Sequence, residues 1–358
     1  MTSLTPPNRR LRVAVLMGGT SSERPVSLKT GSMIVQSLDP ARYEVVAIDT
    51  RDVLRLQGVA PARIAPESVN KNDADPMAIA SVPAGMEALD AAAQTLPPPP
   101  DVVFVALHGK GGEDGTVQGM LEMMGLPYTG SGVLASALAM DKAMTKRLFR
   151  SAGIPVIEDV QVRRGEEADG AALLARVQET LGFPVFVKPN AEGSSFGGTK
   201  VETQEGLLPA VVKALTYDPK VLIERYVQGV EITVGVLGNT HGDLLPLPIV
   251  EIVPKSAFYD FESKYADGGS EHIIPARLPE TVTQRAQELA VQCHNLLGCR
   301  GMSRTDMLVV GETLSVLEVN TIPGMTPTSL LPQAAAHAGI SFAQLLDRFL
   351  TAALEDRS

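Results

Sequence analysis

This sequence of 358 residues has only two cysteines, no long apolar run and no excess of basic residues. Its two cysteines, Cys293 and Cys299, fit no metal-binding spacing, and so few of them favour a reducing compartment, where we expect both to be buried. No apolar run could cross a bilayer, and residues 1–10 are too polar for a secretory signal. A net charge of −10 argues against nucleic acid as a partner. We therefore expect a cytoplasmic protein with neither a membrane nor a nucleic acid as its partner.

The composition is that of a folded protein with more than one domain. Hydrophobic residues make up 44% and charged residues 20% of a chain that is too long for one ordinary core. Predicted strands over 11–17, 43–49 and 101–107, with a helix over 27–37, are typical of a parallel α/β sheet. With boundaries near Gly130 and Gly229, we expect three α/β or α+β domains, over 1–130, 131–228 and 229–358.

Further elements follow from the apolar periodicity. Asp169 and Gly182 are typical of the start and end of a helix over 170–181. The segment 52–95 reads as surface loop and short helix. The other predicted helices cover 136–151, 281–297 and 341–354, and the other predicted strands cover 184–188, 221–226, 231–237, 247–253, 307–310 and 314–319.

Two short stretches near the C-terminus carry the most chemical information. They are Arg304-Thr-Asp306 and Leu317-Glu-Val-Asn320, and because side chains alternate along a strand, each places its polar residues on one face. With Gly311-Glu-Thr313 as a three-residue hairpin loop, Val310 would pair with Leu314. Asp306 would then face Glu318, and Arg304 would face Asn320. Such oxygen ligands suit Mg²⁺, although an ordinary polar face of an edge hairpin is the alternative.

A second group of motifs suggests a phosphate-binding site. The loop 192–198 is rich in Gly and Ser, whose N–H and hydroxyl groups can cradle phosphates, and Lys188 ends the strand before it. The loop lacks the G-x-x-x-x-G-K-[ST] pattern of P-loop NTPases. Glu224, Tyr226 and Glu231 could hold an adenine and a ribose. The alternative for the loop is a flexible turn, and the alternative for Lys188 is an exposed charge at a strand end. For the segment from Glu224 to Glu231 it is a common strand–turn–strand pattern.

Other loops could complete a small-molecule site. Glu23 and His108 lie in Gly-rich loops that follow the first and third strands, at the sheet edge where ligands bind in open α/β folds. Each could instead be structural. The aromatic stretch 258–269 is expected to be a packed lid, and the loop 320–329 could direct N–H groups at an oxyanion. Ordinary connections are the alternative for both.

Read together, these segments resemble the ATP-grasp superfamily and, within it, the D-alanine–D-alanine ligases. The resemblance runs from about Val13 to Phe349, in the family's order. Its most specific motifs are Leu107-His-Gly-Lys-Gly-Gly-Glu-Asp-Gly115, Gly130-Ser-Gly-Val-Leu-Ala-Ser-Ala-Leu-Ala-Met-Asp-Lys142, Val187-Lys-Pro-Asn-Ala-Glu-Gly-Ser-Ser195, Phe258-Tyr-Asp to Lys264-Tyr265, and Glu318-Val-Asn-Thr-Ile-Pro-Gly-Met-Thr326. It implies a substrate-binding N-terminal domain, with ATP held between the central and C-terminal domains.

The resemblance also implies a reaction. ATP would phosphorylate one D-alanine and the amine of a second would attack the acyl phosphate, in peptidoglycan precursor synthesis. Two Mg²⁺ ions, for which Mn²⁺ can substitute, and a homodimer are implied as well. The implied substrate and catalytic residues are Glu23, His108, Ser194, Tyr265, Arg304, Gly324 and Ser329. The implied ATP contacts are Lys142, Lys188, Glu192, Ser194, Ser195, Glu224, Tyr226, Val227, Glu231, Lys264 and Leu317, and the implied metal ligands are Asp306, Glu318 and Asn320.

Two residues depart from the family pattern. Ala191 stands where many relatives carry a basic residue, and Pro25 stands where an acid is common. Tyr265 is associated with dipeptide-forming members, whereas relatives that make the D-lactate ester differ in this loop. A D-alanine–D-lactate ligase is therefore the enzyme alternative. A nucleotide-binding protein without turnover is disfavoured, because it would have no use for Arg304 at an oxyanion. A dehydrogenase is disfavoured because Gly18-Gly19 lacks the G-x-G-x-x-G spacing.

Overall fold

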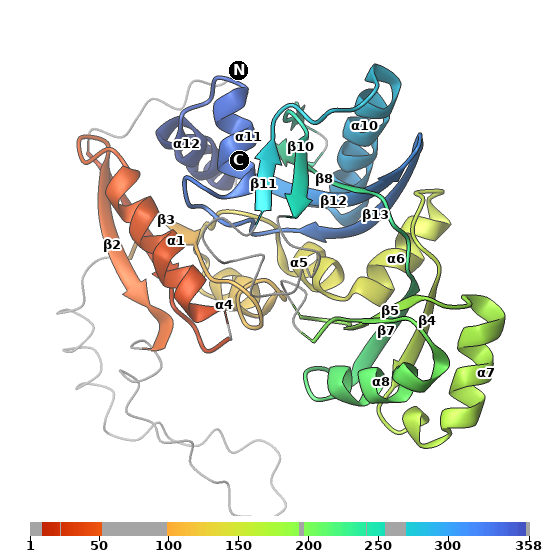
Figure 1. Cartoon of the computed structure of the whole chain (residues 1–358). Helices are drawn as coiled ribbons and strands as arrows, with labels where there is room; N and C mark the ends of the chain where they lie inside the picture. The colour runs from red at the N-terminus through yellow and green to blue at the C-terminus, as the bar shows by residue number, and fades with distance from the viewer. Residues whose placement is uncertain are drawn as a thin grey trace, which may run out of the picture.

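Three separate β-sheets organise the chain (Figure 1). The computed structural model describes residues 9–21, 23–51, 99–192, 197–240, 242–254 and 270–355. The first sheet is parallel, in the order β2-β1-β3, and contains β1 (Leu11–Met17), β2 (Tyr43–Asp49) and β3 (Val102–Val105). The predicted parallel α/β sheet is thereby confirmed, although the third strand is shorter than expected. Helix α1 (Arg24–Ser37) begins three residues before the expected start, with a proline in its first turn, a position that suits proline.

The second sheet is antiparallel and has four strands, in the order β4-β7-β5-β6. These are β4 (Asp159–Arg163), β5 (Val185–Pro189), β6 (Thr199–Val201) and β7 (Lys220–Arg225). Helices α7 (Gly170–Thr180) and α8 (Leu207–Leu215) share its apolar core, and two short 3₁₀ turns (Glu166–Ala168 and Gln204–Gly206) precede them. Asp169 is the predicted N-cap of α7 and accepts a hydrogen bond from the Ala172 N–H at 3.0 Å. β4, β6 and α8 were absent from the sequence prediction.

The third sheet has six antiparallel strands, in the order β11-β10-β8-β12-β13, with β9 also paired to β8. These are β8 (Val230–Leu237), β9 (Leu245–Pro246), β10 (Val250–Pro254), β11 (Ser270–Ile273), β12 (Met302–Val310) and β13 (Thr313–Asn320). Helix α10 (Glu280–Leu297) packs against this sheet and buries Leu289 and Cys293. Cys293 and Cys299 are both buried, which confirms the sequence prediction, and neither forms a disulfide.

The single helix expected over 136–151 is wrong, because two helices cover this region. α5 (Val133–Met140) and α6 (Lys142–Ser151) meet at Asp141, whose backbone is extended at φ −84° and ψ 90°. The Asp141 carboxylate caps α6 by accepting a hydrogen bond from the Met144 N–H at 3.0 Å, and it also pairs with Lys220 at 2.6 Å. Both helices lie between the four-stranded and six-stranded sheets (Figure 1). The break makes Lys142 the first residue of α6.

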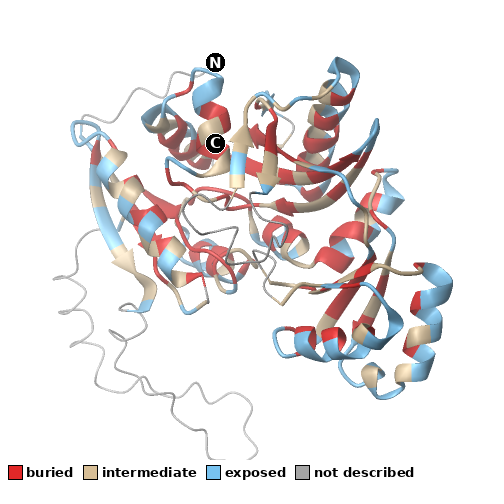
Figure 2. Cartoon of the chain, in the orientation of Figure 1, coloured by how far each residue is buried: buried red, intermediate tan, exposed pale blue. Residues whose placement is uncertain are grey.

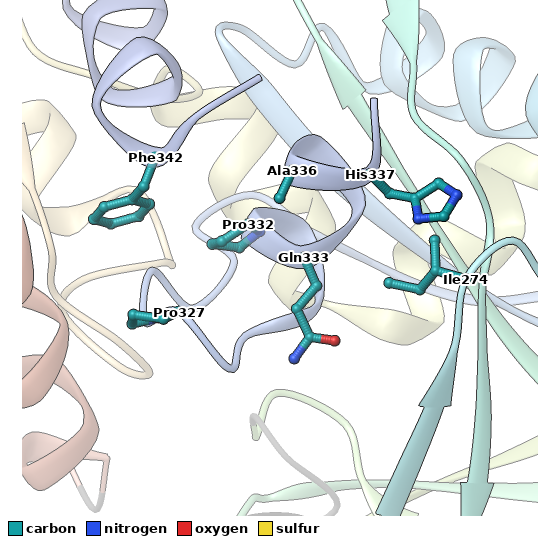
Figure 3. A pocket seen from close by; sticks show the side chains of 7 residues that line it. All are labelled: Ile274, Pro327, Pro332, Gln333, Ala336, His337 and Phe342. Carbon is teal, nitrogen blue, oxygen red and sulfur yellow. The ribbon is translucent and has the colours of Figure 1, made fainter. Parts of the chain in front are cut away.

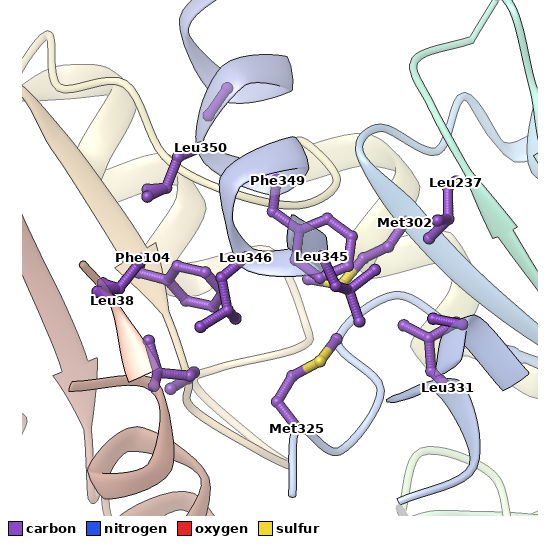
Figure 4. Close-up of a cluster of buried hydrophobic side chains, with 14 of the residues drawn as sticks. Leu38, Phe104, Leu237, Met302, Met325, Leu331, Leu345, Leu346, Phe349 and Leu350 are labelled. Atoms are coloured by element: carbon purple, nitrogen blue, oxygen red, sulfur yellow. The ribbon is translucent and has the colours of Figure 1, made fainter. Parts of the chain in front are cut away.

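The first and last parts of the described chain share one core. Side chains from β1, α1 and β3 pack with those of α11 (Leu330–His337) and α12 (Phe342–Glu355), and Figure 4 shows this cluster. Phe104 of β3 meets Phe349 of α12 edge to face, with ring centres 6.4 Å apart. The Tyr43 hydroxyl donates to Asp347 at 2.8 Å. Buried residues follow this seam in Figure 2, while the outer faces of α7 and α8 are exposed.

Two observations complete the fold. Helix α4 (Thr116–Met123), which follows the Gly-rich loop after β3, buries Val117 and Leu121 against the parallel sheet. Within the described ranges, no helix is long and apolar enough to span a membrane. The segment 52–95 and the expected lid over 258–269 lie outside the described residues.

Candidate active site

The hairpin of β12 and β13 pairs its polar residues as expected, but by a different route. Asp306 lies opposite Glu318, and Arg304 lies opposite Asn320. The expected three-residue loop is wrong: Val310 pairs with Thr313, which leaves a two-residue loop whose Gly311 adopts a φ of +59°. A β-bulge after Asp306 then inserts Leu317 as an unpaired residue and restores the expected register. Leu317 and Glu318 are accordingly both half-buried, which interrupts the alternation along β13.

Asp306 accepts hydrogen bonds from three neighbouring side chains. The Arg304 guanidinium donates two hydrogen bonds to it, at 3.0 and 2.9 Å. The Asn320 amide donates a third at 3.0 Å, and the Thr233 hydroxyl of β8 a fourth at 2.5 Å. Asn320 therefore turns its N–H₂ toward Asp306 and keeps its oxygen available. The carboxylate is fixed in position from three sides.

Glu318 lies beside a lysine on the neighbouring helix. The Lys142 ammonium is 3.2 Å from Glu318 and donates to the Glu192 carbonyl at 2.8 Å. A small cavity is lined by Glu113, Lys142, Glu192, Glu318 and Asn320, together with Ala139, Met140, Val319 and Thr321. The described residues contain no group of three or more His, Cys, Asp or Glu side chains that could enclose a metal. Two carboxylates and one amide oxygen nevertheless fit Mg²⁺, which commonly takes its remaining ligands from substrate phosphates and water.

Glu224 lies at the centre of a buried group of charges behind this cavity. Its carboxylate is 2.5 Å from the Lys146 ammonium and 2.7 Å from the Lys188 ammonium. Burial tends to raise the pKa of Glu224, but the two lysines outweigh this and hold the pKa below its usual range. Burial tends to lower the pKa of Lys188, but Glu224 and Glu318 outweigh it and raise the pKa. Glu224 is therefore ionised and paired.

The segment after Glu224 connects the second sheet to the third. Tyr226 follows the end of β7, hydrogen-bonds through its N–H to the Pro184 carbonyl at 3.0 Å, and stacks its ring on the Lys200 ammonium at 4.1 Å. Val227 is half-buried beside it. Glu231 enters β8, opposite Leu308 of β12. These residues line the junction between the two sheets.

Glu23 and His108 come together at the edge of the parallel sheet. A Cβ atom at Gly109 would lie only 2.8 Å from the Glu23 carboxylate, so the glycine permits this approach. The Ser21 hydroxyl donates to the His108 carbonyl at 2.7 Å, and Thr30 lies 3.2 Å from Nε2 of His108. Burial lowers the pKa of His108 to about 4, which keeps its imidazole neutral near pH 7. The loops that carry Glu23 and His108 therefore lie side by side, as expected for two walls of a small-molecule site.

The loop after β13 folds back on itself. A Cβ atom at Gly324 would lie 3.0 Å from the Ser329 hydroxyl, and that hydroxyl accepts a hydrogen bond from the Thr326 N–H at 3.1 Å. Ser329 is the N-cap residue of α11. Gly324 and Ser329 are thus neighbours at a helix N-terminus, which favours negatively charged groups.

Comparison with known proteins decides the family. Sequence models described as D-ala D-ala ligase N-terminus and D-ala D-ala ligase C-terminus match residues 12–131 and 148–351. The D-alanine–D-alanine ligase of Syntrophobacter fumaroxidans is 46% identical over 350 residues, which covers 97% of this chain and 99% of the relative. The chain belongs to the D-alanine–D-alanine ligase family. The ligase of Moorella thermoacetica is 44% identical, over 96% of this chain and all of the relative.

Solved structures agree with this family assignment. The D-alanine–D-alanine ligase of Bacillus anthracis, in a crystal structure complexed with ATP, has a TM-score of 0.72 and 32% identity, over 97% of this chain and 98% of that one. The ligase of Coxiella burnetii has a TM-score of 0.73 and 27% identity, over 97% of this chain and 94% of its own. The predicted ATP-grasp fold is thereby confirmed.

Four predicted ligase residues cannot be placed. Ser194, Ser195, Lys264 and Tyr265 all lie outside the described residues. Their roles stay predictions from the sequence.

Sequence reasoning missed two residues of this candidate site. Glu113 is half-buried in the small cavity, where burial and the nearby charge of Glu23 raise its pKa to about 8. Its carboxylate accepts a hydrogen bond from the Gly109 N–H at 2.7 Å. Lys146 is fully buried against Glu224. Glu113 belongs to the same Gly-rich motif as His108, and Lys146 follows Lys142 by one helical turn, so weak signals for both existed.

A larger pocket lies away from these residues. It has a volume of about 500 Å³ and lies between α11 and the end of β11 (Figure 3). It contains none of the predicted site residues, and its largely apolar walls offer little to phosphate or metal. The pocket therefore does not resemble the charged site predicted at the hairpin. The pocket is lined by Ile274, Pro327, Pro332, Gln333, Ala336, His337 and Phe342.

Proposed function

We propose that this protein is an ATP-dependent ligase that joins two D-alanine molecules into D-alanyl-D-alanine, a peptidoglycan precursor. The observation that carries this proposal is the facing pair Asp306 and Glu318, with Arg304 and Lys142 in direct contact with them, in a member of this ligase family. Acids, an arginine and a lysine on one face supply what phosphoryl transfer needs, which is positioning and charge neutralisation.

The first step places one D-alanine against the parallel sheet. Its ammonium group lies beside the Glu23 carboxylate, and neutral His108 lines the same wall. One carboxylate oxygen attacks the γ-phosphorus of ATP, so a bond to phosphorus forms while the bond to the ADP oxygen breaks. ADP and D-alanyl phosphate result. Ser194 and Tyr265 are proposed to connect Glu23 with the lid.

ATP lies at the junction of the second and third sheets. Lys142, Lys188 and Lys264 bind its phosphates, with Glu192, Ser194 and Ser195 nearby, and the base and ribose lie against the segment from Glu224 to Glu231 and against Leu317. Asp306, Glu318 and Asn320 are proposed to hold two Mg²⁺ ions. When bound, these ions would neutralise the negative charge of the transferring phosphoryl group.

The second step forms the peptide bond. The deprotonated amine of the second D-alanine attacks the acyl carbon and forms the C–N bond. The bond from carbon to the phosphate oxygen breaks as the tetrahedral intermediate collapses, and inorganic phosphate leaves with the proton that the nitrogen loses. Arg304 and the Gly324 N–H face the oxyanion. Ser329, at the N-terminus of α11, binds the carboxylate of the second D-alanine. Three domains, over 1–130, 131–228 and 229–358, a homodimer and a cytoplasmic location are part of the proposal.

Product analysis tests this function. Purified protein with ATP, Mg²⁺ and D-alanine should form D-alanyl-D-alanine and one phosphate per dipeptide, detected by chromatography and a phosphate assay. Leaving out any one component should abolish the product, and L-alanine should not replace D-alanine. D-lactate serves as the control for the ester reaction and should give no depsipeptide between pH 6 and 9. Absence of the dipeptide under these conditions would falsify the proposal, and light scattering tests the homodimer.

A further inference from the structure

Lys146 is a charged residue that the reaction above does not use. It lies on α6 with only 1% of its side chain exposed, 2.5 Å from Glu224 of β7 and 3.4 Å from Asp159 of β4. Burying a charged pair is costly, and well-packed apolar residues often do as well or better for stability. A purely structural reason for this lysine is therefore weak, and its position beside the nucleotide site calls for another.

The two oxygens of Glu224 hold two different lysines. Lys146 contacts Oε1 from α6 and is buried, whereas Lys188 contacts Oε2 from β5 and keeps 13% of its side chain exposed. Lys188 also lies within the electrostatic influence of Glu318, on the hairpin side of the site. Lys146 is thus the enclosed partner of the carboxylate, and Lys188 is the partner with access to the site.

The four side chains behind Lys188 already balance one another in charge. The cations are Lys146 and Arg150, and the anions are Glu224 and Asp159, with Arg150 paired to Asp159. This gives two positive and two negative charges. Lys188 adds one further positive charge, which the group does not need and which a phosphate could take.

We propose that Lys146 is a positioning residue of the nucleotide site: it holds the Glu224 carboxylate permanently, so that Lys188 can leave that carboxylate for the phosphates of ATP. This inference rests on the proposed function, in which Lys188 binds ATP. Without Lys146, the departure of Lys188 would leave a buried carboxylate unpaired. Lys188 would then stay on Glu224, and nucleotide would have to compete with an internal ion pair.

A double-mutant cycle tests this role. The variants are Lys146→Met, Glu224→Gln and the pair together, with Arg147→Met as the matched control, because Arg147 is the next residue of α6, is exposed and donates to Gln161. Titration calorimetry with Mg-ADP gives the affinity, and steady-state kinetics give KM for ATP and for D-alanine. Lys146→Met should raise the Kd of ADP and the KM of ATP by about tenfold, equivalent to about 1.4 kcal/mol. KM for D-alanine should change less than about twofold.

The cycle separates positioning from mere stability. In the Glu224→Gln background, Lys146→Met should change the ADP affinity by less than about twofold, because no charge remains for the lysine to hold. An equal loss of affinity in both backgrounds, or no loss in either, overturns the inference. If wild-type protein forms no dipeptide, the proposed function fails, whereas an active wild type with an unaffected Lys146→Met variant refutes only this inference.

A second measurement needs no altered Lys146. In wild-type protein labelled with ¹³C-glutamate, the carboxyl resonance of Glu224 is assigned by its loss in Glu224→Gln and followed with pH, with and without Mg-ADP. Because Lys146 stays in place, Glu224 should titrate below the ordinary range for glutamate in both states. A return to the ordinary range when ADP binds would show that Lys188 alone had held the carboxylate ionised, and would overturn the inference.

Discussion

Replacing Arg304 by methionine separates two roles that the hairpin combines. Arg304 donates two hydrogen bonds to Asp306, and both side chains are partly exposed, at 17% and 19%. Hydrogen bonds to charged groups contribute about 1.5–3 kcal/mol each to the free energy of unfolding when buried. Because solvent partly screens this pair, we expect its two bonds together to contribute about 2 kcal/mol. Asp306 would keep its bonds from Thr233 and Asn320. The carboxylate should therefore stay in position without its neighbouring cation.

Arg304→Met should lower kcat without weakening metal binding. Losing one donor to an oxyanion typically lowers kcat by about 10² to 10³. The Mg²⁺ concentration for half activation should stay equal or fall, because no arginine competes for Asp306, and the Kd of ADP should change less than about threefold. Glu318→Gln should instead raise the Mg²⁺ requirement by about tenfold or more, since Mg²⁺ has few protein ligands here.

The assay is phosphate release measured against Mg²⁺ concentration, with ADP affinity from calorimetry. Arg277→Met is the matched control, because Arg277 makes a similar two-bonded pair with Glu251 on the same sheet, and the described structure places that pair outside the hairpin. A tenfold higher Mg²⁺ requirement in Arg304→Met, or a kcat within about threefold of wild type, would refute the division of roles.

Three further predictions concern stability. The pKa of Glu113 is raised to about 8 in the folded protein, whereas the unfolded chain releases this proton above about pH 4.5. The stability of wild type should therefore fall, relative to that of Glu113→Gln, as the pH rises from 4.5 to 8. Melting temperatures that change in parallel for the two proteins across this range would refute the prediction. Asp141→Ala removes the cap of α6 and should speed hydrogen exchange in its first turn by an amount equivalent to about 1 kcal/mol, leaving α10 unchanged. Phe349→Ala should cost about 3–5 kcal/mol in denaturant unfolding, with Phe349→Leu clearly milder; equal losses would contradict the packing argument.

Local sequence signals predicted the helices and strands well where residues close together in the sequence determine them. β1 and β2 have the predicted bounds, because each is a run of strand-forming residues with turn residues beside it. The break between α5 and α6 could not be read in this way. Good helix formers lie on both sides of Asp141, and although aspartate is a favoured N-cap and caps α6 here, its carboxylate is also engaged by Lys220, 79 residues later in the chain. A contact of that range leaves no periodic trace in the sequence.

The candidate site was predicted in part through two errors that cancel. The loop of the hairpin is one residue shorter than expected, and the bulge at Leu317 adds one residue to β13, so Asp306 still meets Glu318. Strand alternation cannot reveal a bulge, because the extra residue resembles its neighbours. Glu113 and Lys146 escaped prediction because burial and distant partners, Glu23 and Glu224, give them their character.

The shared core of the first strands and the last helix sets an order for synthesis. β1 and β3 leave the ribosome early, but Leu345, Leu346 and Phe349, which cover them, are made some 240 residues after Phe104, as their numbers show. At about 5–20 residues per second, the parallel sheet would wait more than ten seconds with one apolar side uncovered. During that interval the nascent chain offers a surface to chaperones. A stop codon placed before α12 should therefore yield an aggregating chain rather than a smaller enzyme.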